Sequence, residues 1–264
     1  MFSRLHVTQE SGLLNVRFNR PERHNAFDLK MMEELEAFWM REASKKDLDC
    51  IILSADGEHF SVGGDIKELM DPAVLEEGGA ARLIALSRRI VLNLLHVECP
   101  IVCAVQGVAA GLAANLALLA DVLVLSDDAR IGDTHVKIGL APGDSGPVIW
   151  PLVMPISRAK EYLMLGEWVD APEALRLGLT RNVTPRENLQ SLSVDVARKF
   201  VGMPRLAVRA AKTAVNQIVL RRFVELMGFA GAAEEITFAS TDHLRAREDF
   251  LKRSKDSSSS RNVT

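Results

Sequence analysis

Two glycine-containing junctions could present main-chain N–H groups to a ligand. In "HFSVGGDIKEL" the pair Gly63–Gly64 stands between a strand-like run and a predicted helix. In "AVQGVAAGLAANLALLAD" Gly107 and Gly111 stand between a second strand pattern and a small-residue helix. N–H groups at a helix N-terminus point outward, and the helix dipole favours negative charge there. Each junction alone also fits a tight turn or close core packing. If both converge on one oxygen, they form an oxyanion hole, worth roughly 3 kcal/mol per donor.

The composition narrows the classes of protein to which such a site could belong. The chain has 264 residues, ordinary hydrophobic content and a formal net charge of −3, so we expect no nucleic-acid partner. Cys50, Cys99 and Cys103 lie in apolar stretches and match no zinc or disulfide spacing, which favours the cytoplasm. We expect no metal, no membrane span and no separate cofactor.

Alternating strand and helix patterns predict an α/β core with parallel strands. "RLHVTQ" and "LLNVRF" flank a hairpin turn, and Asp28 should cap a helix over 29–46. "CIILSA" and "IVCAV" read as buried strands, with an insert at 71–81 and a helix over 82–97 between them. Asp65 and Glu68 resemble a capping box.

The strand patterns stop near residue 185, and helices are predicted over 187–201, 206–221, 222–239 and 241–253. The predicted helix over 222–239 is apolar on several faces, which indicates subunit contacts. We therefore divide the chain into an α/β core (1–200), a helical oligomerisation region (201–253) and a polar, disordered tail (254–264).

Several motifs in this order resemble the crotonase superfamily, the enoyl-CoA hydratase/isomerase fold. They are "RFNRPERHNAF", "HFSVGGDIKEL", "AVQGVAAGLAANLALLADVLVLSDDARIG" and "VKIGLAPGDSG", and the similarity spans about residues 4–253. The resemblance implies a spiral of ββα units with a C-terminal helical trimerisation region, in a trimer or a dimer of trimers. It also implies an acyl-CoA substrate whose thioester carbonyl binds the N–H groups of Gly64 and Leu112. The remaining residues expected to bind the CoA ester are Arg20, Arg23, Ser61, Gly63, Asp65 and Ile66.

The positions that match the two hydratase glutamates are Asn115 and His135, which makes simple hydration doubtful. An amide cannot exchange a proton as a carboxylate does, although Asn115 could orient a water or a substrate hydroxyl. His135 could serve as a base, or it could be a structural residue held by Asp133. Asp144 could pair with His135, or either Asp144 or Ser145 could cap the following helix.

Three functions remain open on the sequence. The first is an acyl-CoA enzyme of the enoyl-CoA hydratase/isomerase type with altered acid–base residues, which covers lyase and isomerase reactions. The second is a His135-dependent hydrolase of a thioester or a β-diketone. The third is a non-catalytic acyl-CoA-binding protein. The glycines of the two junctions favour an enzyme, because a binder needs the pocket but no polarising amides.

Overall fold

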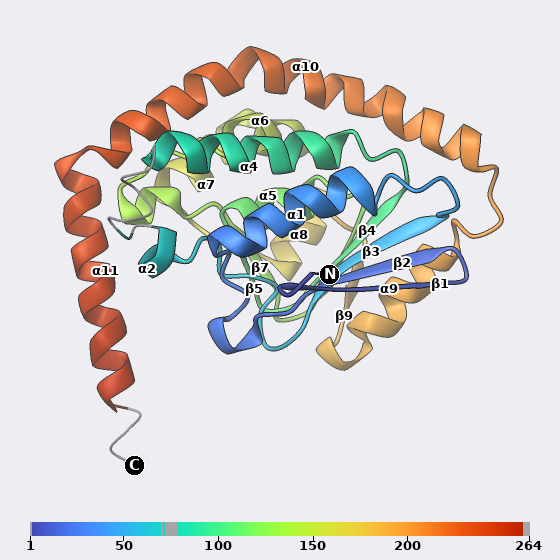
Figure 1. Ribbon diagram of the computed structural model, residues 1–264, viewed down its shortest axis with the longest axis horizontal. Helices are drawn as coiled ribbons and strands as arrows, with labels where there is room; N and C mark the ends of the chain where they lie inside the picture. Colours follow the sequence, from blue (N-terminus) through green and yellow to red (C-terminus); the bar gives the residue numbers. More distant parts are fainter. Residues whose placement is uncertain (1, 70, 72–78, 261–264) are drawn as a thin grey trace.

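The computed structural model describes residues 2–69, 71 and 79–260, and a six-stranded sheet lies at its centre (Figure 1). The strand order is β1-β2-β3-β4-β6-β9, and only β1 and β2 are antiparallel. A second sheet has the order β5-β7-β8. The strands are β1 (Leu5–Glu10), β2 (Leu13–Phe18), β3 (Cys50–Ala55), β4 (Ile101–Val105), β5 (Val108–Ala110), β6 (Val122–Ser126), β7 (Arg130–Gly132), β8 (Val169–Asp170) and β9 (Asn182–Thr184). The predicted α/β core with mainly parallel strands is confirmed.

The predicted hairpin connects β1 and β2 through a two-residue turn. Ser11 and Gly12 both have positive φ, at 50° and 79°. Two such residues give the turn whose twist matches that of the strands, and glycine adopts positive φ without a steric penalty. The pairing runs from Leu5 opposite Phe18 to Glu10 opposite Leu13.

Both faces of the central strands β3 and β4 are buried, which explains their uninterrupted apolar runs. Successive side chains of a strand point to opposite faces. Ile51 and Leu53 therefore join the core beneath the helices of one face. Cys50 and Ile52 join a smaller cluster on the other face, which one helix (Leu189–Arg198) covers. Burying each large apolar side chain contributes about 1.5–3 kcal/mol.

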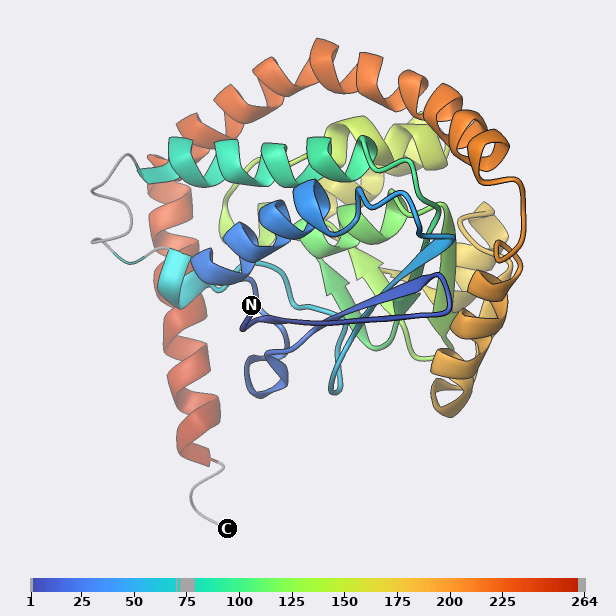
Figure 2. The ribbon, with the colours of Figure 1, turned by 45° about the vertical axis from the view of Figure 1, so that its right-hand side comes forward.

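The helices are α1 (Leu29–Arg41), α2 (Ile66–Leu69), α4 (Gly79–Leu95), α5 (Leu112–Leu118), α6 (Gly146–Val153), α7 (Ile156–Leu165), α8 (Ala171–Leu177), α9 (Leu189–Arg198), α10 (Arg205–Phe238) and α11 (Thr241–Ser260). Short 3-10 turns are η1 (Pro21–Arg23), η2 (His135–Ile138) and η3 (Arg186–Asn188). Figure 2 shows α1 and α4 on the same face of the sheet, and the two helices pack together. None of the helices in the described part of the chain is long and apolar enough to cross a membrane.

Asp28 caps α1 as predicted, because its Oδ1 atom accepts a hydrogen bond of 2.7 Å from the N–H of Met31. The helix ends at Arg41, before the predicted end at 46, and the chain turns back there to enter β3. The predicted insert over 71–81 falls outside the described residues at 72–78, and α4 begins at Gly79 rather than 82.

The C-terminal region differs from the prediction in two places. The expected helices over 206–221 and 222–239 are one continuous helix, α10. The sequence has no proline between 205 and 238, and extending a helix costs less than starting a new one. Helix α11 extends to Ser260 and so includes part of the segment from 254, whose disorder stays a prediction. Residues 261–264 lie outside the described residues.

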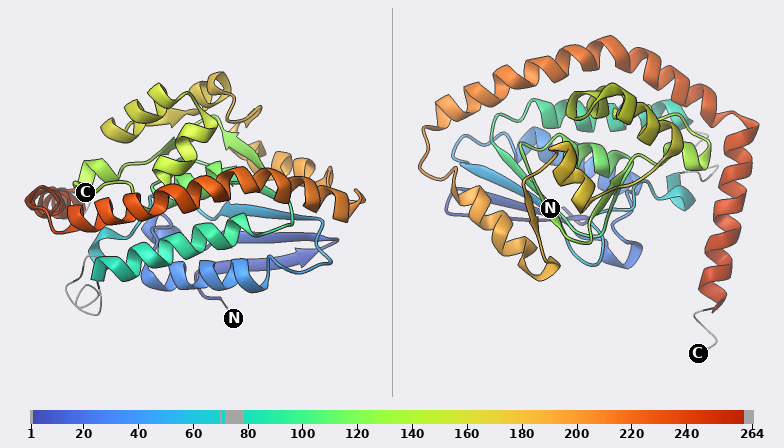
Figure 3. Two further views of the ribbon diagram at one scale, coloured as in Figure 1. Left: turned by 90° about the horizontal axis from the view of Figure 1, so that it is seen from above. Right: turned by 180° about the vertical axis from the view of Figure 1, so that it is seen from behind.

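Helix α10 passes across the helical side of the molecule and reaches the segment that carries His135. From above it runs between α4 and α6, and it packs against both (Figure 3). Helix α11 then turns away and contacts η2, where the Nδ1 atom of His243 lies 2.6 Å from the carbonyl oxygen of Ile138. The C-terminal helices therefore help to position η2.

Candidate active site

The two glycine junctions lie side by side because the chain segments before them run parallel. The N–H of Ser61 donates to the carbonyl of Val108 at 2.9 Å, and the N–H of Ala110 donates to the carbonyl of Ser61 at 3.0 Å. Parallel segments advance in step, so Gly64 and Leu112 both follow this contact closely in the chain. Neither of their N–H groups donates a hydrogen bond to another described residue. Both residues line one cavity.

Glycine is required where these junctions approach each other and His135. Gly63 has φ of +88°, and a Cβ atom there would lie 3.2 Å from the carbonyl oxygen of Ala110. Gly111 has φ of +54°, and a Cβ atom would lie 3.3 Å from the Cε1 atom of His135. Ser61 is buried and fixes the first junction, because its Oγ atom donates to the carbonyl of Asn25 and accepts from the N–H of Gly63. Ser61 is a supporting residue and does not line the cavity.

Arg20 lies in the core, although the sequence resemblance placed it near the CoA phosphates. Its guanidinium group contacts Asp28 at 3.2 Å and Asp65 at 2.8 Å, and it donates to the carbonyl of Ala26. Only 7% of Arg20 is exposed, and it does not line the cavity. The carboxylate of Asp65 also contacts Arg23, so it serves these ion pairs instead of the predicted capping box. Burial alone would raise the pKa of Asp65, but its hydrogen bonds with Arg20 and Arg23 lower it overall.

Replacing Arg20 by glutamine is expected to lower the free energy of unfolding by about 3–5 kcal/mol, because Asp28 and Asp65 would lose the buried cation that they share and keep only the more exposed Arg4 and Arg23. Urea unfolding at neutral pH measures this change. Arg23→Gln is the control, since Arg23 is exposed and its pair with Asp65 should contribute less than about 1 kcal/mol.

The same ion pairs make stability depend on pH. The stabilisation from Asp65 is present above its unfolded pKa and is lost as the pH falls through its lowered folded pKa. The free energy of unfolding should therefore fall less steeply at acid pH in Arg20→Gln than in the unchanged protein. Equal losses in both variants would contradict this assignment.

The cavity has a volume of about 910 Å³, within the range of small-molecule sites. Part of its lining is apolar, from Phe27, Met32 and Leu83 among others. Gly63, Asp65 and Ile66, three of the residues that were expected to bind the CoA ester, line the cavity. Exposed cationic residues at the cavity are Arg23, Lys67 and Lys137, which are suited to a phosphate-bearing ligand.

His135 lies at the cavity between two buried aspartates. Its Nδ1 atom is 2.6 Å from Oδ1 of Asp133, and its Nε2 atom is 3.7 Å from Oδ2 of Asp144. The His135–Asp144 pair that the sequence left open is therefore present. Ser145 occupies the N-cap position of α6 without a capping hydrogen bond, which differs from the alternative prediction for that residue.

The charges of this cluster determine where its protons lie. Burial opposes the charged form of His135, but the charges of Asp133 and Asp144 outweigh it and raise the pKa of His135 well above its usual value. Burial raises the pKa of Asp144 to about 6, and the charge of His135 offsets part of this rise. Near neutral pH the cluster therefore holds an imidazolium beside a carboxylate that can accept a proton.

Asn115 supports this cluster from behind. It is fully buried, and its Oδ1 atom accepts a hydrogen bond of 3.0 Å from the indole N–H of Trp150. Its amide hydrogens point to Asp144 at 2.9 Å and to Asp133 at 3.4 Å. Asn115 does not line the cavity. It is a positioning residue for the two aspartates, so the predicted role of orienting a water or a substrate hydroxyl does not fit this geometry.

One residue that lines the same cavity was not predicted from the sequence: Glu234, a buried carboxyl group of α10. Phe223, Met227 and Ala230 form the buried stripe of that helix, and Glu234 occupies the next position of the stripe. The sequence did contain a signal for this residue. One acidic residue follows three apolar residues at the spacing of a helix face.

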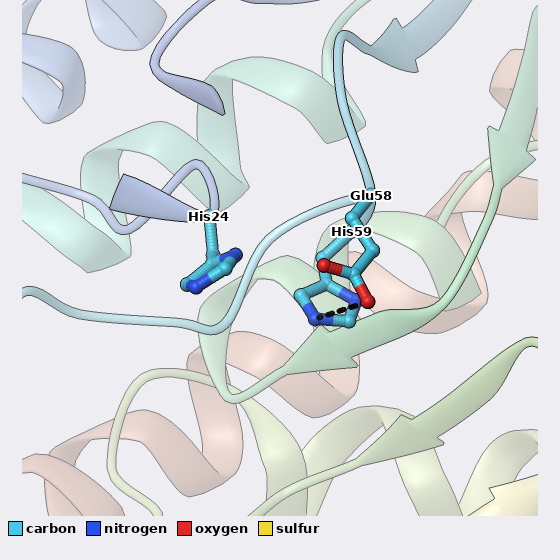
Figure 4. A group of neighbouring side chains, drawn as sticks. All are labelled: His24, Glu58 and His59. Carbon is cyan, nitrogen blue, oxygen red and sulfur yellow. Dashed lines mark ion pairs between the residues drawn. The ribbon is translucent and has the colours of Figure 1, made fainter. Parts of the chain in front are cut away.

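A second group of polar residues, His24, Glu58 and His59, has the spacing of metal ligands (Figure 4). The Nδ1 atom of His59 lies 3.3 Å from the N–H of Val108 and accepts from it. A metal on Nε2 would require a proton on Nδ1, which would then face another N–H group. Burial also lowers the pKa of His59, and nearby positive groups add to this effect while Glu58 opposes it. These interactions disfavour a cation. Asp133, His135 and Asp144 form a further group with such spacing, but there the imidazolium already supplies the positive charge.

Comparison with known proteins identifies the family. Residues 8–257 match the family model described as enoyl-CoA hydratase/isomerase. The mouse protein "Enoyl-CoA hydratase domain-containing protein 3, mitochondrial" is 29% identical over 247 residues, which cover 94% of this chain and 81% of that protein. The trans-2-decenoyl-acyl-carrier-protein isomerase of Streptococcus mutans is 29% identical over 238 residues, which cover 88% of this chain and 86% of that protein.

A solved structure supports the same assignment. The crystal structure of an enoyl-CoA hydratase/isomerase from Mycobacterium paratuberculosis superimposes with a TM-score of 0.86 at 29% identity, covering 93% of this chain and 98% of that one. The predicted crotonase-type architecture is thus confirmed. The chain belongs to the enoyl-CoA hydratase/isomerase family.

Proposed function

We propose that the protein binds an acyl-CoA thioester in this cavity and transfers a proton at the carbon next to the thioester carbonyl. The carbonyl oxygen accepts hydrogen bonds from the N–H groups of Gly64 and Leu112. One observation carries the proposal: these two N–H groups have no acceptor among the described residues, and they line one cavity with the carboxyl group of Asp144. Two such donors stabilise the enolate that forms when Cα loses its proton.

Asp144 is the group that takes the proton. A general base works best when its pKa lies close to the working pH, and burial brings the pKa of Asp144 to about 6. The imidazolium of His135 keeps this carboxylate ionised, and Asp133 fixes the ring through its 2.6 Å contact. The base is therefore Asp144, and His135 takes neither of the two roles that the sequence left open for it but serves as the charged partner of that base.

The reaction that fits these groups best is the shift of a double bond between the 3-enoyl and 2-enoyl thioesters. Such an isomerisation needs two proton transfers and consumes no water. Hydration needs a water held for attack, and Asn115 has already given its amide hydrogens to the two aspartates. A relative is named trans-2-decenoyl-acyl-carrier-protein isomerase, which agrees with this choice.

A hydrolase is the second candidate, and the geometry of His135 favours it specifically. An imidazole whose Nδ1 is held by a buried aspartate resembles the base of nucleophilic and hydrolytic sites. In that reaction the cluster would activate a water against a thioester or a β-diketone, and the two N–H groups would stabilise the tetrahedral oxyanion.

The test uses trans-3-hexenoyl-CoA with the protein in deuterated water. We expect the absorbance of the conjugated 2-enoyl thioester to rise, and nuclear magnetic resonance to detect deuterium at Cα. Release of free thiol from acyl-CoAs would favour thioester hydrolysis, and mass analysis of the products would reveal cleavage of a β-diketone. Rapid loss of the enoyl absorbance of crotonyl-CoA would favour a hydratase instead. Binding of CoA esters without any turnover would overturn the enzymatic proposal.

We also propose a homo-oligomer, a trimer or a dimer of trimers. Large apolar side chains of α10 are exposed in the single chain, among them Leu206, Val224 and Phe229 at 78–83% exposure. Their burial against other copies would remove this apolar area from water. Light scattering of the eluting protein measures the mass, and a monomer at micromolar concentration would contradict the proposal.

A further inference from the structure

Glu234 is a carboxyl group that the proposed base does not need. It follows Phe223, Met227 and Ala230 on the buried stripe of α10 and is only 6% exposed. A glutamate in this position must lose most of its hydration, which is costly unless it is paired or neutral. A group retained at such a cost next to a ligand cavity is a candidate for chemistry.

The contacts of Glu234 place it beside the proposed base. A Cβ atom added to Gly143 would collide with the Oε2 atom of Glu234 and would lie 2.8 Å from the carbonyl oxygen of Ala230. The absence of a side chain at Gly143 thus lets α10 approach the residue that precedes Asp144. Glu234 and Asp144 both line the cavity, and the Oε2 atom of Glu234 has no hydrogen-bond partner among the described residues.

Burial, together with the charges of Asp144 and Asp133, keeps the proton on Glu234. The groups that face it are His135, Asp144 and Asp133, so one positive group stands against two negative ones. Burial raises the pKa of Glu234 to about 8, and the charge of His135 offsets only part of the rise. Two carboxyl groups of one cavity therefore differ at neutral pH: Asp144 is mainly ionised and Glu234 mainly neutral. Such a pair is typical of an acid and a base that act together.

We infer that Glu234 is the general acid of this site and protonates the substrate carbon remote from the thioester, while Asp144 removes the proton next to the carbonyl. This inference rests on the proposed function. The bond from Cα to hydrogen breaks, its electron pair enters the dienolate, and Asp144 gains the proton. The O–H bond of Glu234 then breaks as a C–H bond forms at Cγ. The double bond has moved, and exchange with water through the open side of the cavity restores both carboxyl groups.

The experiment compares Glu234→Gln with Glu235→Gln, which changes the exposed neighbour on the same helix. Glutamine keeps the shape and the neutral state of the buried acid but cannot give up a proton. We expect Glu234→Gln to lower the conversion of trans-3-hexenoyl-CoA by about 10²-fold while deuterium exchange at Cα stays within about threefold of the original rate. Glu235→Gln should leave both rates unchanged.

Two results would overturn the inference while leaving the proposed function intact. Full conversion by Glu234→Gln would mean that no proton comes from this residue. Equal losses of exchange and conversion would mean that Glu234 only shapes the cavity. In contrast, an original protein that neither exchanges nor converts the thioester would refute the proposed function itself, so the two failures are distinguishable.

A pH series gives a readout that a structural role would not move. In the original protein, the rate of conversion should fall at alkaline pH as Glu234 loses its proton. The rate of the Glu234→Gln variant should not show this alkaline fall.

The raised pKa also links Glu234 to folding, because the native state binds this proton more tightly than the unfolded chain does. Stability should therefore fall as the pH rises from about 4.5 to about 8, and Glu234→Gln should reduce this fall. Unchanged profiles would contradict the assignment.

Discussion

Asp144→Asn is expected to lower the conversion of a 3-enoyl thioester by about 10³-fold, within the range for loss of a general base. Asparagine has nearly the same shape, so the substrate should still bind and the loss should appear in kcat rather than in KM. Deuterium exchange at Cα should fall by the same factor, since this step needs the base directly. Steady-state kinetics and nuclear magnetic resonance measure the two rates.

The control for this prediction is Asp195→Asn, which removes an exposed carboxylate of α9 far along the chain from the cavity residues. In the original protein, activity should be lost as the pH falls through about 6, because protonation removes the base. The apparent pKa belongs to the coupled cluster with His135 and Asp133. If Asp144→Asn keeps its exchange rate and His135→Asn loses it, the base is His135 and our assignment is wrong.

Leu112→Pro is expected to lower kcat by about 10²–10³-fold by removing one of the two N–H donors. The backbone can accept this change, because Leu112 is the first residue of α5 and its N–H has no partner within the helix. The preceding residue, Gly111, has φ of 54° and ψ of −126°, the mirror image of the extended region that suits a residue before proline.

Leu112→Ala is the matched control, since it shortens the same side chain and keeps the N–H group. We expect it to retain kcat within about tenfold of the original value, and thermal unfolding should establish that both variants fold. Similar kinetics for the proline and alanine variants would show that the oxygen does not bind at this N–H, and the proposed reaction would lose its main support.

The sequence predicts the two glycine junctions better than it predicts the residues that support them. The junctions could be located because a strand, a glycine and a helix follow one another over a few residues, which is a local pattern, whereas Gly64 and Leu112 were implied as donors by the resemblance to the family. The Asp133–His135 contact is local as well. Arg20 could not be placed, because a loop arginine has the same pattern whether it binds phosphate or neutralises buried aspartates. Its partners Asp28 and Asp65 come from separate elements that meet only in the fold.

Glu234 was missed because it reaches the cavity from a helix that lies about ninety residues later in the chain than Asp144. The predicted helix over 222–239 already contained the stripe from Phe223 to Glu234, but its apolar faces were assigned to subunit contacts, so the acidic end of the stripe was not considered. Asn115 was singled out from the sequence, but only its contacts with Trp150 and Asp144 reveal that both ends of its amide are occupied. Contacts between distant segments decide these roles, and composition and periodicity do not contain them.

Because α10 is one unbroken helix, the position of Glu234 depends on the number of residues that precede it in the helix. Near its start, Arg205 contacts Asp49, and Lys212 donates to the carbonyl of Cys99, so the first turns are fastened to the sheet side of the molecule. One residue inserted between 213 and 233 would turn everything beyond it by about 100° and shift it by about 1.5 Å. The carboxyl group of Glu234 would then leave the cavity although every fastening remained. Insertions and deletions in this segment are therefore expected to displace Glu234 from the cavity, whereas substitutions on its outer surface are not.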